Sequence, residues 1–164
     1  MEKTKIDWCD SSWNPVTGCL HSCKYCYARS IANRFSGGGE KWTDDALIEL
    51  NDRIYFDESE KAEAYPYGFK PTLHRYRLNE YEKKGGRNIF VCSMADLFGH
   101  WVPDSWIEEV FSACAKATQH NYLFLTKNPE RFVDLQNNGK LIVADNMWYC
   151  LLYTSPSPRD PKTS

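Results

Sequence analysis

The chain has 164 residues, 42% of them apolar and 26% charged, and its formal net charge is −2. This length suffices for one domain with a buried core but is short for a complete eight-fold α/β barrel, which usually takes roughly 250 residues. The weak negative charge gives no global basic footprint for nucleic acid. No apolar run approaches the ~20 residues of a membrane span and no signal peptide is visible, so we expect a cytoplasmic protein without a membrane partner.

The first half of the chain predicts mixed local structure. Residues 8–18 read as an extended segment that ends in a turn, and residues 27–35 read as a helix because Tyr27, Ile31 and Phe35 recur every four positions. Residues 40–63 hold nine acids against three bases and predict a solvated helix and loop region. Residues 70–87 reverse this balance with six bases against two acids, so this segment could face a polyanion.

The second half of the chain alternates regularly between strand and helix patterns. Short apolar runs at residues 88–93, 121–126 and 145–149 predict strands, and the amphipathic segments at residues 103–118 and 129–135 predict helices. Strands that alternate with helices of this length are typical of βαβ units and a parallel sheet. The fold class is therefore predicted to be α/β.

The last stretch breaks this alternation. Residues 150–164 carry three of the eight prolines and no periodicity, and no helix pattern follows the strand at residues 145–149. The stretch resembles translated vector sequence at the end of a truncated reading frame. We expect residues 1–149 to be the amino-terminal part of a longer (βα) barrel and residues 150–164 to be a foreign or disordered tail.

Seven cysteines in such a chain need a reason. Their number is odd, no secretory signal precedes them, and three crowd into eight residues, which a disulfide framework explains poorly and a metal or cluster site explains well. Cys92 and Cys114 lie in apolar, periodic surroundings and are predicted to be buried small side chains.

The crowded cysteines form the motif C-x3-C-x2-C, with an aromatic residue directly before the third cysteine. Cys19, Cys23 and Cys26 could hold three irons of a [4Fe-4S] cluster and leave the fourth iron open to a small molecule. The loop lies between an extended segment and a helix, and α/β barrels keep their active sites in loops of that kind. His21 lies inside the loop but is not expected to be a ligand.

This motif resembles the signature of the radical S-adenosylmethionine (radical SAM) superfamily. Three further segments resemble a phage-associated family within this superfamily. That family is named only as a phage protein of unknown function. The three segments are Trp13-Asn14-Pro15-Val16-Thr17-Gly18, Ser93-Met94-Ala95-Asp96-Leu97-Phe98 and Leu125-Thr126-Lys127-Asn128-Pro129-Glu130-Arg131. The resemblance implies a barrel of the radical SAM type, here incomplete.

The resemblance also implies roles for particular residues. Cys19, Cys23 and Cys26 would bind the cluster, and S-adenosylmethionine would chelate the open iron, with Tyr25 near its adenine. Reductive cleavage would then release a 5′-deoxyadenosyl radical, with an electron donor such as flavodoxin or ferredoxin as partner. Polar residues that follow two of the strands are candidates for cofactor or substrate contacts: Ser93, Asp96, Thr126 and Lys127.

Two alternatives stay open from the residues alone. Cys9 could join Cys19, Cys23 and Cys26 in a zinc-binding structural or nucleic-acid-binding module. A chain cut within a barrel could also be inactive by itself. The substrate is not written in the motif, although the basic segment at residues 70–87 makes a nucleic acid or nucleotide conceivable, and no catalytic acid or base is identified.

Overall fold

The computed structural model describes residues 6–36, 45–55 and 60–152, and its main feature is a four-stranded parallel sheet. The strands are β1 (Ser11–Trp13), β5 (Asn88–Val91), β6 (Asn121–Thr126) and β7 (Met147–Leu151), in the order β1-β5-β6-β7. Each neighbouring pair is parallel. The predicted α/β class with a parallel sheet is confirmed.

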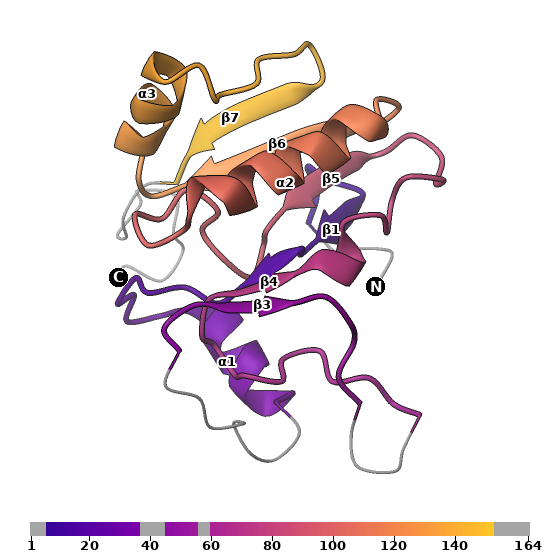
Figure 1. Ribbon diagram of the computed structural model, residues 1–164, viewed down its shortest axis with the longest axis vertical. Coiled ribbons are helices and arrows are strands. Elements are labelled where there is room, and N and C mark those ends of the chain that lie inside the picture. The colour runs from indigo at the N-terminus through magenta and orange to yellow at the C-terminus, as the bar shows by residue number, and fades with distance from the viewer. Residues whose placement is uncertain (1–5, 37–44, 56–59, 153–164) are drawn as a thin grey trace.

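Helices α2 (Asp104–Lys116) and α3 (Glu130–Asn137) connect these strands, and α2 lies across one face of the sheet (Figure 1). Every second residue of β6 is buried, which places its inward residues in one cluster with the apolar stripe of α2. The predicted burial of Cys92 and Cys114 is confirmed, since both belong to this cluster. Other members are Ile89, Val91, Trp106, Ile107, Val110, Phe111, Tyr122 and Phe124.

A second, three-stranded sheet lies beside the first and was not predicted. It has the order β2-β4-β3, from β2 (Val16–Thr17), β4 (Thr72–His74) and β3 (Ile48–Leu50). Strand β4 runs antiparallel to β2 and parallel to β3, and a short 3-10 helix, η1 (Arg75–Arg77), follows it. Helix α1 (Tyr27–Arg34) packs its buried Ala28 and Ala32 in a smaller cluster with Tyr65 and Met94.

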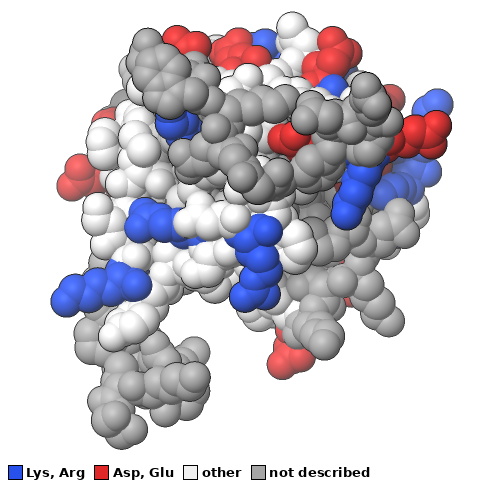
Figure 2. All heavy atoms as spheres, turned by 90° about the horizontal axis from the view of Figure 1, so that it is seen from below, with Lys and Arg blue, Asp and Glu red and all other residues white. Residues whose placement is uncertain are grey.

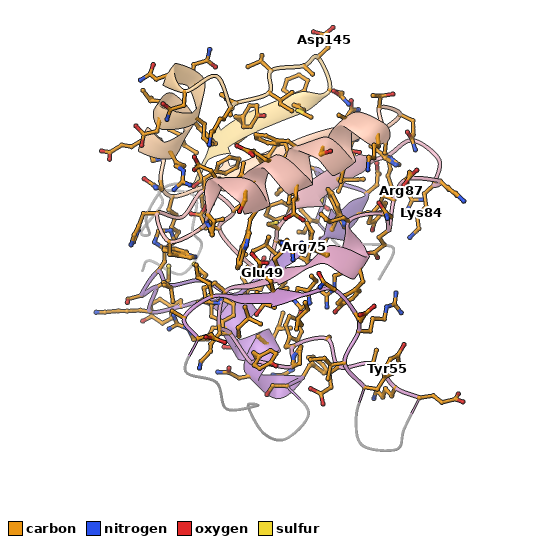
Figure 3. The ribbon with its side chains drawn as sticks, in the orientation of Figure 1. Glu49, Tyr55, Arg75, Lys84, Arg87 and Asp145 are labelled. Atoms are coloured by element: carbon orange, nitrogen blue, oxygen red, sulfur yellow. The ribbon has the colours of Figure 1, made fainter. Side chains whose placement is uncertain are left out.

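Arg75 joins the second sheet to helix α2. Its guanidinium donates to both carboxylate oxygens of Glu109 on α2 at 2.9 Å and also pairs with Glu49 of β3 at 2.8 Å. Glu49 in turn accepts a hydrogen bond from Trp106 Nε1 at 2.7 Å. Figure 3 shows Glu49 and Arg75 facing one another between the second sheet and α2. The second sheet and α2 are thus linked by a branched ion pair as well as by apolar packing.

Two sequence expectations need correction here. Where a helix was expected within residues 40–63, the described residues form strand β3 and no helix, because Ile48 and Leu50 can pair with β4. Strand β7 continues to Leu151, so Cys150 and Leu151, which were assigned to the tail, pair with β6. Residues 153–164 lie outside the described residues. None of the described helices has the length and apolar character needed to cross a membrane.

Candidate functional site

A hollow of about 230 Å³ opens at the carboxyl ends of the strands of the parallel sheet. It is lined by all eight residues that the sequence predicted to bind the iron–sulfur cluster or S-adenosylmethionine. Its walls are the cysteine loop between β2 and α1 and the segments that follow β5 and β6. The predicted lining residues are Cys19, Cys23, Tyr25, Cys26, Ser93, Asp96, Thr126 and Lys127, and they are joined by His21, Tyr27, Ala28, Phe69, Phe90, Ala95, Leu125 and Leu152.

Gly18 fixes where the cysteine loop begins. Its φ of +85° lies in the left-handed region, and a Cβ at this position would sit 2.2 Å from the carbonyl oxygen of Lys70. Its amide donates to the carbonyl of Met94 at 3.0 Å. Only glycine permits this turn and this approach of backbones, so the chain leaves β2 in one direction and delivers Cys19 to the hollow.

Each of the three cysteine sulfurs accepts one N–H. The amide of His21 donates to Cys19 Sγ at 3.4 Å, and the amide of Arg29 donates to Cys26 Sγ at 3.4 Å, with Cys26 serving as the N-cap of α1. Lys127 Nζ donates to Cys23 Sγ at 3.0 Å. All three cysteines are free of disulfides. N–H donors of this kind stabilise thiolates and tune sulfur ligands.

Asp96 joins the cysteine loop to the parallel sheet. Its Oδ2 pairs with His21 Nε2 at 2.9 Å and accepts from the amide of Lys127 at 3.0 Å. Its Oδ1 accepts from the hydroxyl of Thr126 at 2.7 Å and from the amide of Phe98 at 3.1 Å. Asp96 is buried, so these bonds satisfy both oxygens without water.

Ser93 belongs to a second connection, built on Asn14. Asn14 Oδ1 accepts from the Ser93 hydroxyl at 3.1 Å and from the amide of Met94 at 2.9 Å. The carbonyl of Ser93 accepts from the hydroxyl of Tyr27 at 3.0 Å. Directly before Ser93, Cys92 has a φ of +57°, a strained backbone for a residue with a side chain. This turn at the end of β5 directs Ser93 toward the hollow.

The surroundings of the site affect its ionisable groups. Burial raises the pKa of the Cys19 thiol to about 11, and the negative charge of Asp96 acts in the same direction. Burial also raises the pKa of Tyr27. Tyr25 is 92% exposed, so it stands at the open rim of the hollow. Because the pKa of Cys19 is raised, a metal ion that binds its sulfur must displace a firmly held proton.

His21 and Asn14 are the site residues that the sequence did not single out for a role in the site. His21 is 75 residues from Asp96 in the chain, and Asn14 is 79 residues from Ser93. No local pattern reveals pairs at such separations. The one available signal was position, because His21 lies inside the cysteine motif and Asn14 lies five residues before it.

In the ranges that the structure describes, no three His, Cys, Asp or Glu side chains converge closely enough to hold a single metal ion. Cys9, the fourth ligand of the zinc alternative, is buried and is not among the residues that line the hollow. Burial raises the pKa of its thiol. Cys9 therefore does not share the hollow with the three cysteines of the loop.

The basic segment at residues 70–87 is partly occupied by internal contacts. Arg75 takes part in the ion pairs described above, Arg77 donates to the carbonyls of Asn14 and Ala64, and Arg87 donates to Ser11 Oγ. Figure 2 shows the charged side chains on one face of the molecule. Lys and Arg side chains near its middle stand apart from one another, and most acids lie toward its edges. Among the described residues of this face, the basic side chains do not form a continuous surface.

A comparison with known families assigns the chain to one of them. The model of a family described as "Protein of unknown function (DUF5131)" matches residues 3–155. The chain belongs to this family. The match includes the whole candidate site, from Asn14 to Leu152. No curated protein and no solved structure matches the chain.

Proposed function

We propose that this member of the family is the cluster-binding part of a radical SAM enzyme, with Cys19, Cys23 and Cys26 as the ligands of a [4Fe-4S] cluster. One observation carries the proposal. Three free cysteines on a single loop, each with an N–H donor on its sulfur, line a hollow at the carboxyl ends of parallel strands. This is the end of a parallel α/β sheet at which ligands bind.

The arrangement suits a cluster better than a single zinc ion. A structural zinc ion needs four ligand atoms at about 2.0–2.3 Å from one point. The thiolates of an iron–sulfur cluster bind separate irons, so their sulfurs stand further apart around the cluster. The described side chains offer no close triplet, and the three loop cysteines face a hollow instead.

When bound, the cluster would supply the electron that cleaves S-adenosylmethionine to the 5′-deoxyadenosyl radical. The residues of the chain divide into two groups around it. Ser93, Asp96 and Thr126 direct their polar atoms into the protein, so they shape the wall of the site. Tyr25 presents an exposed ring at the rim, where it can lie against a flat base such as adenine.

Apolar side chains complete the hollow. Phe90 and Leu125 come from β5 and β6, Phe69 comes from the segment before β4, and Leu152 follows β7. Such a lining keeps water away from reactive species. The four parallel strands and their helices would form part of a (βα) barrel, with the hollow at its active end. Flavodoxin or ferredoxin as electron donor, and a nucleic acid or nucleotide as substrate, belong to the same proposal.

The test is anaerobic reconstitution with iron and sulfide, followed by iron, sulfide and zinc analysis, a visible spectrum and an S-adenosylmethionine cleavage assay on one sample. We expect about four irons per chain and release of 5′-deoxyadenosine. Replacement of Cys19, Cys23 or Cys26 by Ala should abolish cluster binding. One tightly held zinc ion without cleavage would favour the structural module instead.

Cys92→Ala and Cys114→Ala are the matched controls for these variants. Both cysteines are buried in the core and line no part of the hollow, so iron content should stay near that of the wild type. Equal loss of iron in all five variants would show general misfolding and would contradict the assigned ligands.

A further inference from the structure

Lys127 is placed to act on the cysteine loop from the opposite wall of the hollow. It directly follows β6, and its Nζ reaches Cys23 Sγ at 3.0 Å across 104 residues of sequence. A contact between an ammonium group and a sulfur at this distance is a charge-assisted hydrogen bond. Lys127 therefore brings a positive charge to one of the three proposed ligands.

The backbone at Lys127 is held firmly. Its amide donates to Asp96 Oδ2 at 3.0 Å, and the amide of Asn128, the next residue, donates to Thr126 Oγ1 at 3.0 Å. Thr126 is itself buried and bonded to Asp96. The backbone at residues 126–128 thus has little freedom, so the direction of the Lys127 side chain follows from the end of β6.

We propose that Lys127 is a positioning residue that raises the reduction potential of the cluster through its hydrogen bond to Cys23. The inference rests on the proposed function. Reduction adds one electron to the cluster without a proton, and the added negative charge is stabilised by a nearby ammonium group. Net charge and hydrogen bonds to the sulfurs are known determinants of iron–sulfur potentials.

The negative charge of Asp96 acts on Cys19, whereas the direct contact at Cys23 is made by Lys127. Asp96, the acid on the same wall, directs its oxygens to His21, Phe98, Thr126 and Lys127 rather than to a cysteine. Lys24, which lies in the cysteine loop, has an exposed side chain. Water screens a charge at the surface, so Lys24 should affect the cluster far less than Lys127.

The experiment compares the midpoint potential of the reconstituted wild type with those of Lys127→Met, Lys127→Arg and Lys24→Met. Each protein is first analysed for iron, sulfide and circular dichroism, and is then titrated with dithionite in the presence of redox dyes, with the cluster followed by its visible absorption and electron paramagnetic resonance. Met keeps most of the length of Lys but has neither charge nor N–H donor. Arg keeps both.

We expect Lys127→Met to retain its irons and to show a more negative potential, while Lys127→Arg and Lys24→Met stay close to the wild type. An unchanged potential in Lys127→Met would overturn the proposal. An equal shift in Lys24→Met would also overturn it, because the effect would then be one of net charge alone. Loss of iron from a folded Lys127→Met would assign the residue to cluster assembly instead. A wild-type chain that holds no cluster would overturn the proposed function itself, so the two failures are distinguishable.

Discussion

At the scale of single residues, Asp96 decides whether the site keeps its shape. Its four hydrogen-bond donors come from three separate segments, which are the cysteine loop, its own turn and the end of β6. No other described carboxylate in the hollow has this role, since Asp96 is the only acid among the lining residues. Removal of this carboxylate would leave several donors without an acceptor in a buried place.

We therefore expect Asp96→Ala to lower the free energy of unfolding by about 3–5 kcal/mol, because each buried donor without a partner costs about 1–3 kcal/mol. The matched control is Asp104→Ala. Asp104 pairs with Arg131 and Lys140 at the surface, where such pairs contribute about 1 kcal/mol or less. Urea denaturation of both variants measures the difference. Equal losses would show that Asp96 is no more than an ordinary surface acid.

The sequence predicted which residues gather at the hollow but could not predict how they bond. Asp96, Thr126 and Lys127 were expected at the rim because they follow strands, and parallel strands end at the same edge of a sheet. That the Thr126 hydroxyl would donate to Asp96, and that His21 would pair with the same carboxylate, depends on the register between distant segments. Register is set by the packed core, which local patterns do not encode.

At the scale of elements, the three-stranded sheet contains a buried histidine that should make it sensitive to acid. His74 on β4 has no exposed surface, and its ring nitrogens lie 2.8 Å from Thr17 Oγ1 on β2 and 2.9 Å from the Tyr76 hydroxyl. Burial, together with the positive charge of Arg77, lowers the pKa of His74 to about 2. The imidazole is therefore neutral in the folded protein at ordinary pH.

The sign of the pH dependence follows from this lowered pKa. Above pH 6.5, the ordinary pKa of a histidine side chain, neither state binds a proton here. Below this pH, His74 binds a proton in the unfolded chain but stays neutral in the folded protein. The free energy of unfolding therefore falls by about 1.4 kcal/mol per pH unit. Between pH 6 and pH 4.5 the wild type should lose about 2 kcal/mol more than His74→Gln. Parallel stability curves for the two proteins, measured by urea denaturation, would contradict the assignment.

The elements of this sheet were also the ones that the sequence missed. The longer, periodic elements at residues 103–118 and 121–126 were predicted nearly as they occur in α2 and β6. Strands β3 and β4 have three residues each, which is too short for a period of two to stand out. Both also lie in charged segments, and pairing with each other and with β2 overrides the local preference.

At the scale of the whole molecule, the first strand of the parallel sheet pairs with a strand that comes much later in the chain. Strand β1 pairs with β5, and α1 and the three-stranded sheet lie between them in the sequence. The alternation of strands and helices predicted the run β5-β6-β7 but contained no signal for the place of β1. The chain between β1 and β5 delivers the cysteine loop to the same edge as the ends of β5 and β6, so the topology itself assembles the hollow.

The boundary of the folded unit can be tested in the same terms. The sequence favoured an end at residue 149, whereas Cys150 and Leu151 pair with Leu125 and Thr126, and the amide of Leu152 donates to the carbonyl of Thr126 at 2.7 Å. A chain that ends at Leu152 should therefore be more stable than one that ends at Tyr149, by roughly 1–3 kcal/mol for the lost ladder bonds.

Thermal and urea denaturation of these two chains, with iron content after reconstitution, measure this difference. The shorter chain should also bind less iron, because Thr126 donates to Asp96, which in turn accepts from the amide of Lys127. Since both chains lack residues 153–164, any difference belongs to residues 150–152. Equal stability and equal iron would place the end of the folded unit at residue 149, and Leu152 would then be dispensable for the hollow.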